Sequence, residues 1–420
     1  MIAILILLAI FLSFFYSLAL NKQYAAVLLI LMASGNMSPP MYGVIVVLFI
    51  AVTLQFLFAF LKTKQNKSFL WILLLPITYI LAIFLIQPYV INVYNYLGYL
   101  TALLFFAWVT LLKWDVRKIV YFLTAYGSYL ILSGFLEKII TGKERIGLVL
   151  TVATAYAVVL VITWTIWTVC AFLSKIYSVK TILFGTFMVF LAIIISGTRM
   201  GLIGIFLGLG LCGLSVVFIK NKNINLLKVA FYSTCVMALS LLFSFIIWNL
   251  LPNDLRIKKA FSSLMAGKMD LENMGRVVIW ASSIDIIEKN KFLGIGAGNF
   301  HKKLKAFLES TNLYSVAGYS HGINTHSHNI YLMVLTEHGV IGFIVLSIFV
   351  FLCLLQPFLY FLKERREGRQ RPEFFALLSG FIVMAVLGAT DSMGMLLPTT
   401  GFAAWLLGTC ASFKREREIC

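Results

Sequence analysis

The chain has 420 residues, of which 61% are hydrophobic and only 12% are charged, with a formal net charge of +18. A soluble protein cannot remove that much apolar surface from water, so the composition indicates a polytopic membrane protein. The apolar stretches are long runs without the alternation of barrel strands, which makes an all-α fold the expectation.

Apolar runs long enough to cross a bilayer, which takes about 20 residues, recur along the whole chain. They are 41–61, 69–88, 95–112, 119–136, 147–173, 181–197, 200–219, 229–250, 330–362, 374–390 and 394–412. Residues 1–36 supply one more unit, which Asn21-Lys22 interrupts and which two short helices would satisfy. It lacks a basic start and a cleavage site, so we expect a retained helix rather than a signal peptide.

About 12 transmembrane helices are therefore expected, with one large loop. The organisation that follows is membrane helices in 1–250, a loop with short amphipathic helices in 251–329, and C-terminal membrane helices in 330–420.

The positive charge is distributed as in membrane proteins rather than as in nucleic-acid-binding proteins. Basic clusters follow every second apolar run, at Lys62/Lys64/Lys67, Lys113/Arg117/Lys118, Lys175/Lys180, Lys220/Lys222/Lys228, Lys363 to Arg371 and Lys414/Arg415/Arg417. Cytoplasmic loops carry this excess of Lys and Arg. The clusters and the C-terminus are thus predicted to be cytoplasmic, with membrane lipids rather than nucleic acid as the surroundings.

Counting crossings from Lys220 places Arg199 and the whole of 251–329 on the opposite, extracytoplasmic face. The loop ends at Thr325-His326-Ser327-His328-Asn329, where the next apolar run begins. Arg199, the loop and His328 are therefore expected on one side of the membrane, and polar chemistry gathered there points to a lipid-linked substrate.

Within the loop, residues 275–288 have apolar side chains at 277, 280, 284 and 287, a spacing that predicts an amphipathic helix. Arg276 would lie in its first turn, where exposed backbone amides also favour anions. The following Gly294-x-Gly296-x-Gly298 resembles half of a nucleotide fingerprint, but no strand precedes it. A tight turn with positive φ at the glycines is the alternative.

Several polar side chains near these boundaries are candidates for chemistry. Arg199 lies between two apolar runs, where an arginine needs compensation; it either snorkels or binds phosphate with its planar fork. His326 and His328 admit a metal site, a structural role at a helix start, or a general base for a sugar hydroxyl. Glu337, roughly 13 Å along the next helix from His328, should be paired or protonated.

Three patches together resemble the bacterial O-antigen ligase and polymerase superfamily. They are Ser196-Gly197-Thr198-Arg199; Gly275-Arg276-x-x-x-Trp280 followed by Phe292-Leu293-Gly294-Ile295-Gly296; and His328-Asn329, nine residues, Gly339, two residues and Gly342. The last pattern is similar to the ligase signature His-(Asn/Ser/Gln)-x9-Gly-x-x-(Gly/Thr/Tyr). From residues 339 and 342 alone, we expect close approach of a neighbouring helix.

The resemblance implies a lipid-donor glycosyltransferase of the inner membrane, with its active site facing the periplasm. An O-antigen ligase would transfer glycan from undecaprenyl pyrophosphate to the lipid A-core acceptor with inversion. Arg199 and Arg276 would hold the pyrophosphate and His328 would activate the acceptor hydroxyl, while His326, Asn329 and Glu337 are further candidates for substrate binding. No metal and no cofactor are implied.

Other functions remain open from the sequence. A polysaccharide polymerase and a protein O-oligosaccharyltransferase share similar residues. A transporter of lipid-linked glycan would instead need polar residues along several helices, whereas the apolar runs here carry few charges.

Overall fold

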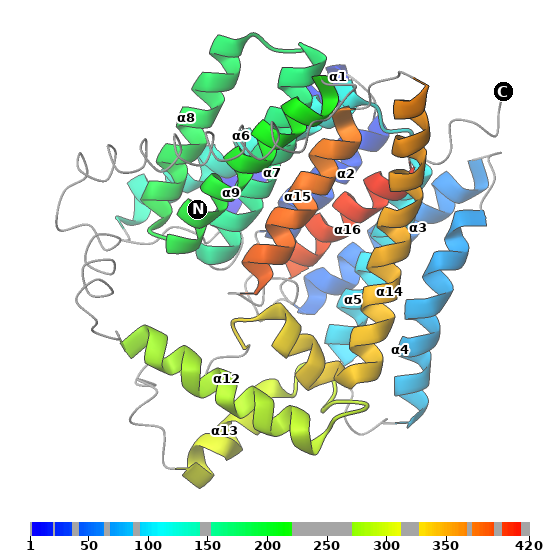
Figure 1. Ribbon diagram of the computed structural model, residues 1–420, viewed down its shortest axis with the longest axis vertical. Helices are drawn as coiled ribbons and strands as arrows, with labels where there is room; N and C mark the ends of the chain where they lie inside the picture. The colour runs from blue at the N-terminus through cyan, green and yellow to red at the C-terminus, as the bar shows by residue number, and fades with distance from the viewer. Residues whose placement is uncertain are drawn as a thin grey trace.

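The computed structural model describes residues 2–19, 22–35, 42–62, 68–86, 93–142, 153–220, 271–311, 327–367, 372–389 and 397–412. This part of the chain is helical and contains no strand, so the all-α prediction is confirmed (Figure 1). Four helices are long and apolar enough to cross a membrane by length and composition: Val116–Thr141, Ala153–Ser174, Val179–Ser196 and Ile330–Glu364. Several shorter apolar helices accompany them, and the molecule is a multi-pass membrane protein.

The helices keep the labels of Figure 1. In chain order they are α1 (Ile2–Ala19), α2 (Lys22–Gly35), α3 (Tyr42–Lys62), the 3-10 helix η1 (Ser68–Leu73), α4 (Leu74–Ile86), α5 (Val93–Leu111), α6 (Val116–Thr141), α7 (Ala153–Ser174), α8 (Val179–Ser196), α9 (Arg199–Lys220), α12 (Leu271–Lys289), α13 (Phe300–Thr311), α14 (Ile330–Arg366), α15 (Pro372–Gly388) and α16 (Leu397–Ser412). The first apolar unit is thus two helices, and the predicted run 229–250 lies outside the described residues.

The core of the bundle forms around α7, which packs against α6, α8, α9 and α15. In its apolar window 72% of residues are buried, against 28% in α8 and 22% in α14, so α7 is central and those two helices are peripheral. Next to it, aromatic rings join α6 to α16: Phe122 stacks on Trp405 at 4.8 Å and Tyr126 stacks on Phe402 at 5.6 Å between centroids. Such contacts add to the burial that holds helices together.

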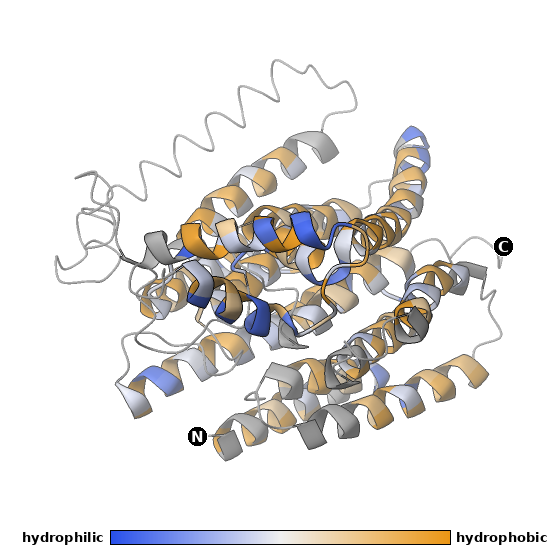
Figure 2. Cartoon of the chain, turned by 90° about the horizontal axis from the view of Figure 1, so that it is seen from below, coloured by the Kyte–Doolittle hydropathy of each residue, from blue (hydrophilic) through white to orange (hydrophobic). Residues whose placement is uncertain are grey.

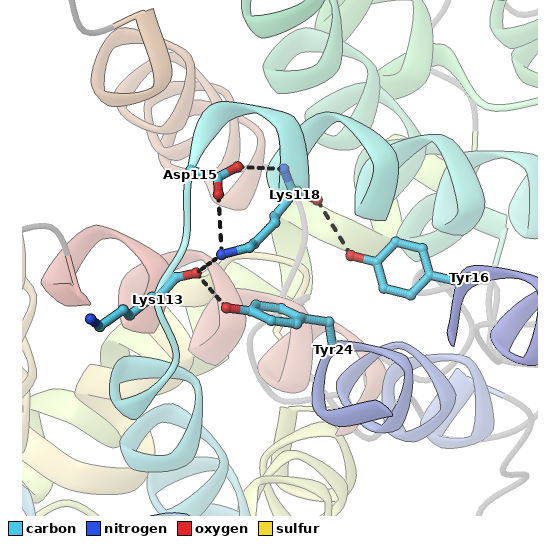
Figure 3. Close-up of polar contacts among 5 residues, drawn as sticks. All are labelled: Tyr16, Tyr24, Lys113, Asp115 and Lys118. Atoms are coloured by element: carbon cyan, nitrogen blue, oxygen red, sulfur yellow. Dashed lines mark hydrogen bonds and ion pairs between the residues drawn. The ribbon is translucent and has the colours of Figure 1, made fainter. Parts of the chain in front are cut away.

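A polar cluster ties the N-terminal helices to the turn between α5 and α6 (Figure 3). Lys118 bridges the Asp115 carboxylate at 3.1 Å and the Lys113 carbonyl at 2.9 Å. Tyr24 of α2 also donates to the Lys113 carbonyl, and Tyr16 of α1 donates to the Lys118 carbonyl at 3.4 Å. The end of α1 and the start of α2 therefore lie beside a basic cluster that the charge pattern predicts to be cytoplasmic.

Helices α12 and α13 lie across one end of the bundle, here called the α12 end (Figure 1). Viewed toward that end, hydrophilic residues gather on these two helices while apolar residues dominate the helices behind them (Figure 2). Helix α13 buries Phe300, Leu304 and Leu308 at a spacing of four, and its lysines stay exposed. The described part of the predicted loop 251–329 thus contains two helices, of which α13 is clearly amphipathic.

The Tyr24 cluster lies toward the opposite end. Tyr99, near the start of α5, contacts the ring of His338 beside α12 at 5.6 Å between centroids. Helix α5 then continues for 12 residues to Leu111, roughly 18 Å away, before it reaches Lys113.

Cysteine labelling tests this arrangement of the ends. Lys22, at the start of α2, and Lys302, on α13, are both exposed. In spheroplasts we expect a membrane-impermeant maleimide to label Lys302→Cys, and to label Lys22→Cys only after permeabilisation. The unsubstituted chain is the control for labelling of the six native cysteines, of which Cys170, Cys353 and Cys410 are buried. Labelling of both positions from outside would contradict the arrangement.

Candidate active site at the α12 end

His328 has an uncommon backbone conformation, fixed by the residues on either side. Its φ is 52°, in the left-handed region that non-glycine residues rarely occupy. Asn329 caps α14, because its Oδ1 accepts the backbone N–H groups of Tyr331 at 2.9 Å and Leu332 at 3.0 Å. The Ser327 hydroxyl donates to the Asn329 carbonyl at 2.6 Å. Such strain, held by neighbouring contacts, is frequent at functional sites.

The turn that carries His328 is joined directly to the helix that carries Arg276. The Trp280 indole N–H of α12 donates to the Ser327 carbonyl at 3.0 Å. Arg276 lies one helical turn before Trp280, roughly 6 Å along the axis and on the same side of α12. Arg276 and His328 are both half-buried. The second and third sequence patches therefore meet in the structure.

Arg199 is the first residue of α9, directly after a tight turn from α8. Gly197 ends α8 with φ 67°, and the hydroxyls of Ser196 and Thr198 lie 2.9 Å apart, both residues being buried. The first N–H groups of a helix lack intrahelical partners and attract anions. The backbone of Arg199 thus lies at the N-terminus of α9, the positive end of the helix dipole. The side chain of Arg199 is outside the described part of the structure.

The last turn of α15 connects the Arg199 helix with the His328 turn. Gly204 of α9 packs closely against Leu387 of α15, so that an added Cβ would meet it. Gly388 at the end of α15 packs in the same way against Ile330, the first residue of α14. The Tyr331 hydroxyl also donates to the Ala385 carbonyl at 2.7 Å. These contacts bring the beginning of α9, the end of α15 and the beginning of α14 to the same end of the bundle. Arg199, Arg276 and His328 therefore share the α12 end.

Helix α14 bends sharply near its beginning (Figure 1), at Gly339, whose φ of 64° and ψ of −170° are not helical. The bend interrupts the helical hydrogen bonds, and residues 290–298, here called the glycine loop, replace them. The N–H groups of Ile295 and Gly296 donate to the carbonyls of Thr336 at 3.0 Å and Glu337 at 2.9 Å. This closes one side of the bend.

After the bend, the direction of donation is reversed: N–H groups of α14 donate to carbonyls of the glycine loop. The N–H groups of Val340 and Ile341 donate to the carbonyls of Lys291 at 2.8 Å and Phe292 at 3.2 Å. Four backbone hydrogen bonds therefore join the loop to the bend, and we call this arrangement the backbone clamp. It satisfies polar groups that a bent helix would otherwise leave buried without partners.

Glycine is required where the glycine loop touches the bend of α14. A Cβ at Gly339 would overlap the Phe292 carbonyl, and a Cβ at Gly294 (φ 69°) would overlap the Glu337 carbonyl. The predicted tight turn with positive φ is confirmed, since Gly296 and Gly298 also have positive φ. Gly342 is close to Tyr79 of α4, as expected for a small residue at a helix contact.

Glu337 has a structural partner that the sequence does not reveal. Its side chain is 2% exposed, and Oε1 accepts the Gly298 N–H at 2.7 Å. A second backbone hydrogen bond joins its carboxyl to Phe300, the first residue of α13. A carboxyl oxygen that accepts free N–H groups at the start of a helix acts as a cap, so Glu337 caps α13 from another helix. No ion pair of Glu337 occurs among the described residues, and its predicted role in substrate binding stays a prediction.

Two further expectations need correction or lie beyond the structure. The predicted helix exists as α12, but Val277 and Ile284 of the expected apolar face are exposed, and the buried face consists of Val278, Ile279, Ser282, Ser283 and Ile286. Both hydroxyls bond the Ile279 carbonyl, at 2.7 and 2.8 Å, which lets serines be buried. His326 lies outside the described residues. Within the described part, no group of three or more metal-ligating side chains occurs.

Substitution of Gly339 by alanine tests the clamp. Gly142, which ends α6 with φ 62° and has nothing within 4 Å of an added Cβ, is the matched control. We expect Gly142→Ala to lower the free energy of unfolding by about 1–2 kcal/mol, which is the cost of a left-handed conformation at a residue with a Cβ. Gly339→Ala adds a backbone overlap, so its melting temperature in detergent should fall further. Equal melting temperatures for the two variants would contradict the clamp.

Substitution of Glu337 separates a helix cap from a substrate contact. Glu337→Ala leaves the Gly298 and Phe300 amides without an acceptor, at a cost of about 1–3 kcal/mol. Glu337→Gln keeps an acceptor oxygen, so thermal stability should decrease from wild type to Gln to Ala. If Glu337→Ala melts like the wild type and loses only activity, the capping role is wrong and substrate binding is favoured.

Comparisons with known proteins match one segment of the chain. No curated protein matches the chain. Residues 184–347 match a family described as O-antigen ligase. The matched segment includes Arg199, Arg276, His328 and both parts of the backbone clamp, the glycine loop and the bend of α14. The resemblance seen in the sequence is confirmed over these residues.

Proposed function

We propose that the protein is an O-antigen ligase, which transfers glycan from undecaprenyl pyrophosphate to the lipid A-core acceptor on the periplasmic face of the inner membrane. The family match supports a ligase of lipid-linked glycan. The observation that carries the proposal is the hydrogen bond from Trp280 to the Ser327 carbonyl, because it joins the Arg276 helix to the His328 turn.

In the proposed reaction, a neutral ring nitrogen of His328 accepts the proton of an acceptor hydroxyl. The acceptor oxygen forms a bond to the anomeric carbon from the face opposite the pyrophosphate, so the configuration inverts. The bond from that carbon to the pyrophosphate oxygen breaks, and undecaprenyl pyrophosphate leaves with the bonding electrons. The guanidinium groups of Arg199 and Arg276 stabilise the charge that develops on it.

The α12 end offers what this chemistry needs. The start of α9 contributes helix amides as well as Arg199, and Arg276 and Trp280 approach from α12. Two guanidinium groups provide positive charge for a diphosphate, so the proposal requires no metal ion. The strained backbone at His328 fixes the direction in which its side chain leaves the turn, and such preorganisation favours a base.

The arrangement of buried carboxylates argues for an enzyme rather than a transporter. Among the described residues, the buried carboxylates of Glu137, Glu364 and Glu373 lie within the first or last turns of their helices. The fourth, Glu337, accepts backbone N–H groups beside the bend of α14. A transport path would need ionisable groups in the middle of several helices.

Reconstitution in liposomes with lipid-linked glycan and lipid A-core tests the function. Transfer to core is expected for the wild type and should persist with a chelator. His328→Ala should reduce turnover by roughly a hundredfold or more, the usual contribution of a general base. Arg276→Lys keeps the charge but loses the bidentate fork, so it should fall between wild type and Arg276→Ala.

The acceptor decides among related enzymes. Transfer to a second lipid-linked repeat, but not to core, would make the protein a polymerase. Transfer to a protein hydroxyl would make it a protein O-oligosaccharyltransferase. Full activity in Arg199→Ala, Arg276→Ala and His328→Ala would reject the assigned roles.

A further inference from the structure

Glu137 of α6 carries a buried carboxylate that the proposed reaction does not use. The residue is 2% exposed, and it lies outside the segment 184–347 that matches the O-antigen ligase family. A carboxylate buried in a membrane helix needs a cation or hydrogen-bond donors beside it. The contacts of α6, α7 and α9 show which part of the molecule this carboxylate faces.

Contacts between α6 and α7 fix the height of Glu137 in the bundle. A Cβ added at Gly127 of α6 would lie 3.5 Å from the Thr163 methyl of α7. Farther along α6, the Leu130 carbonyl accepts the Tyr156 hydroxyl at 3.0 Å, so the two helices run in opposite directions. Glu137 comes ten residues after Gly127, roughly 15 Å along the axis, and the same distance back from Thr163 reaches the start of α7. Glu137 therefore lies beside the start of α7.

The side of α6 that carries Glu137 faces α7. Gly127, Gly134 and Glu137 are separated by seven and three residues, a spacing that places them on one stripe of the helix. Gly127 of this stripe touches α7, and Gly134 and Glu137 are buried. Tyr156 of α7 is fully buried and lies close enough to the Glu137 carboxylate for an electrostatic interaction.

The first turn of α9 packs against the same part of α7. A Cβ added at Gly201 of α9 would lie 3.0 Å from the Cβ of Ala157, the neighbour of Tyr156 in the chain. One turn later, Gly204 packs in the same way against Val161, so α7 and α9 run in the same direction. The backbone of Arg199, two residues before Gly201, is therefore level with the start of α7, as the buried carboxylate of α6 is.

We infer that Glu137 is a positioning residue, whose carboxylate pairs with the Arg199 guanidinium and orients it toward the pyrophosphate. This role rests on the proposed function. A guanidinium has five N–H donors, so a carboxylate on one edge leaves donors for phosphate oxygens on another. Before the donor substrate arrives, the pair also avoids a buried arginine without a counter-charge. Lys138, the next residue of α6, leaves the helix in another direction.

Thermal unfolding of the purified full-length protein tests the pair without any substrate. Glu137→Gln and Arg199→Ala each remove one member of a buried pair, whereas the double variant removes both. The double variant should therefore melt at a higher temperature than the sum of the two single decreases predicts. Glu373→Gln is the matched control, because Glu373 is a buried carboxylate in the first turn of α15, at the opposite end of the bundle. Its effect should add to that of Arg199→Ala.

Additive decreases for Glu137→Gln and Arg199→Ala would overturn the inference. It would also be overturned if Glu137→Gln were non-additive with Arg145→Ala instead. Arg145 follows α6 in the chain and lies outside the described residues.

Single-turnover transfer from a radiolabelled donor in liposomes shows whether the pair serves the reaction. Glu137→Gln should lower the rate at least roughly tenfold, which corresponds to one hydrogen bond between charged groups. The donor concentration that gives half the maximal rate should not rise, because the variant removes a negative charge from an anion site. In the Arg199→Ala background, Glu137→Gln should cause no further loss, and Glu373→Gln should leave the rate unchanged.

Glu137→Asp keeps the charge and is the second variant, should Glu137→Gln not fold. Its smaller loss of rate should also vanish in the Arg199→Ala background. A loss that persists in that background, or a raised donor requirement at an unchanged rate, would overturn the positioning role. If the wild type transfers no glycan although the melting temperatures of Glu137→Gln and Arg199→Ala are coupled, the proposed function fails and the pair stands.

Discussion

The backbone clamp between the glycine loop and the bend of α14 is the constraint on which the site depends. A helix that bends at Gly339 loses hydrogen bonds in an apolar environment, where water cannot replace them. The loop restores them with four backbone bonds, and Glu337 holds the start of α13 in the same place. One local break in a membrane helix is thus stabilised by a segment that begins some 50 residues earlier, and the two segments become one structural unit.

This unit explains how a site for polar chemistry can be rigid at the edge of a membrane. The short part of α14 before Gly339 starts with the His328 turn and is held by α12 through Trp280. Behind the bend, the longer part of α14 turns away and leaves an apolar cavity beside Tyr79 and Tyr99. The same bend therefore lies between the His328 turn and the apolar cavity, as a substrate with a charged pyrophosphate and a hydrocarbon chain would require.

Much of this was predictable from local sequence. Apolar runs and basic clusters give the helices, and spaced glycines predict positive φ at Gly294, Gly296 and Gly298. The bend at Gly339 was not predicted, because the length and composition of residues 330–362 indicate one apolar run although Thr336-Glu337-His338-Gly339 interrupts it. The capping role of Glu337 and the buried serines of α12 were missed for a different reason: their partners are backbone groups, which leave no pattern in the side chains. Periodicity therefore found α12 but assigned its packed face wrongly.

A double-mutant cycle on the binding of undecaprenyl pyrophosphate tests the central claim most directly, because it measures whether Arg199 and Arg276 hold one group. Binding to the wild type, Arg199→Ala, Arg276→Ala and the double variant would be measured by calorimetry in detergent. If both arginines bind the same diphosphate, their effects are non-additive by about 0.5 kcal/mol or more. Additive effects, or binding that neither substitution weakens, would contradict a shared pyrophosphate site at the α12 end.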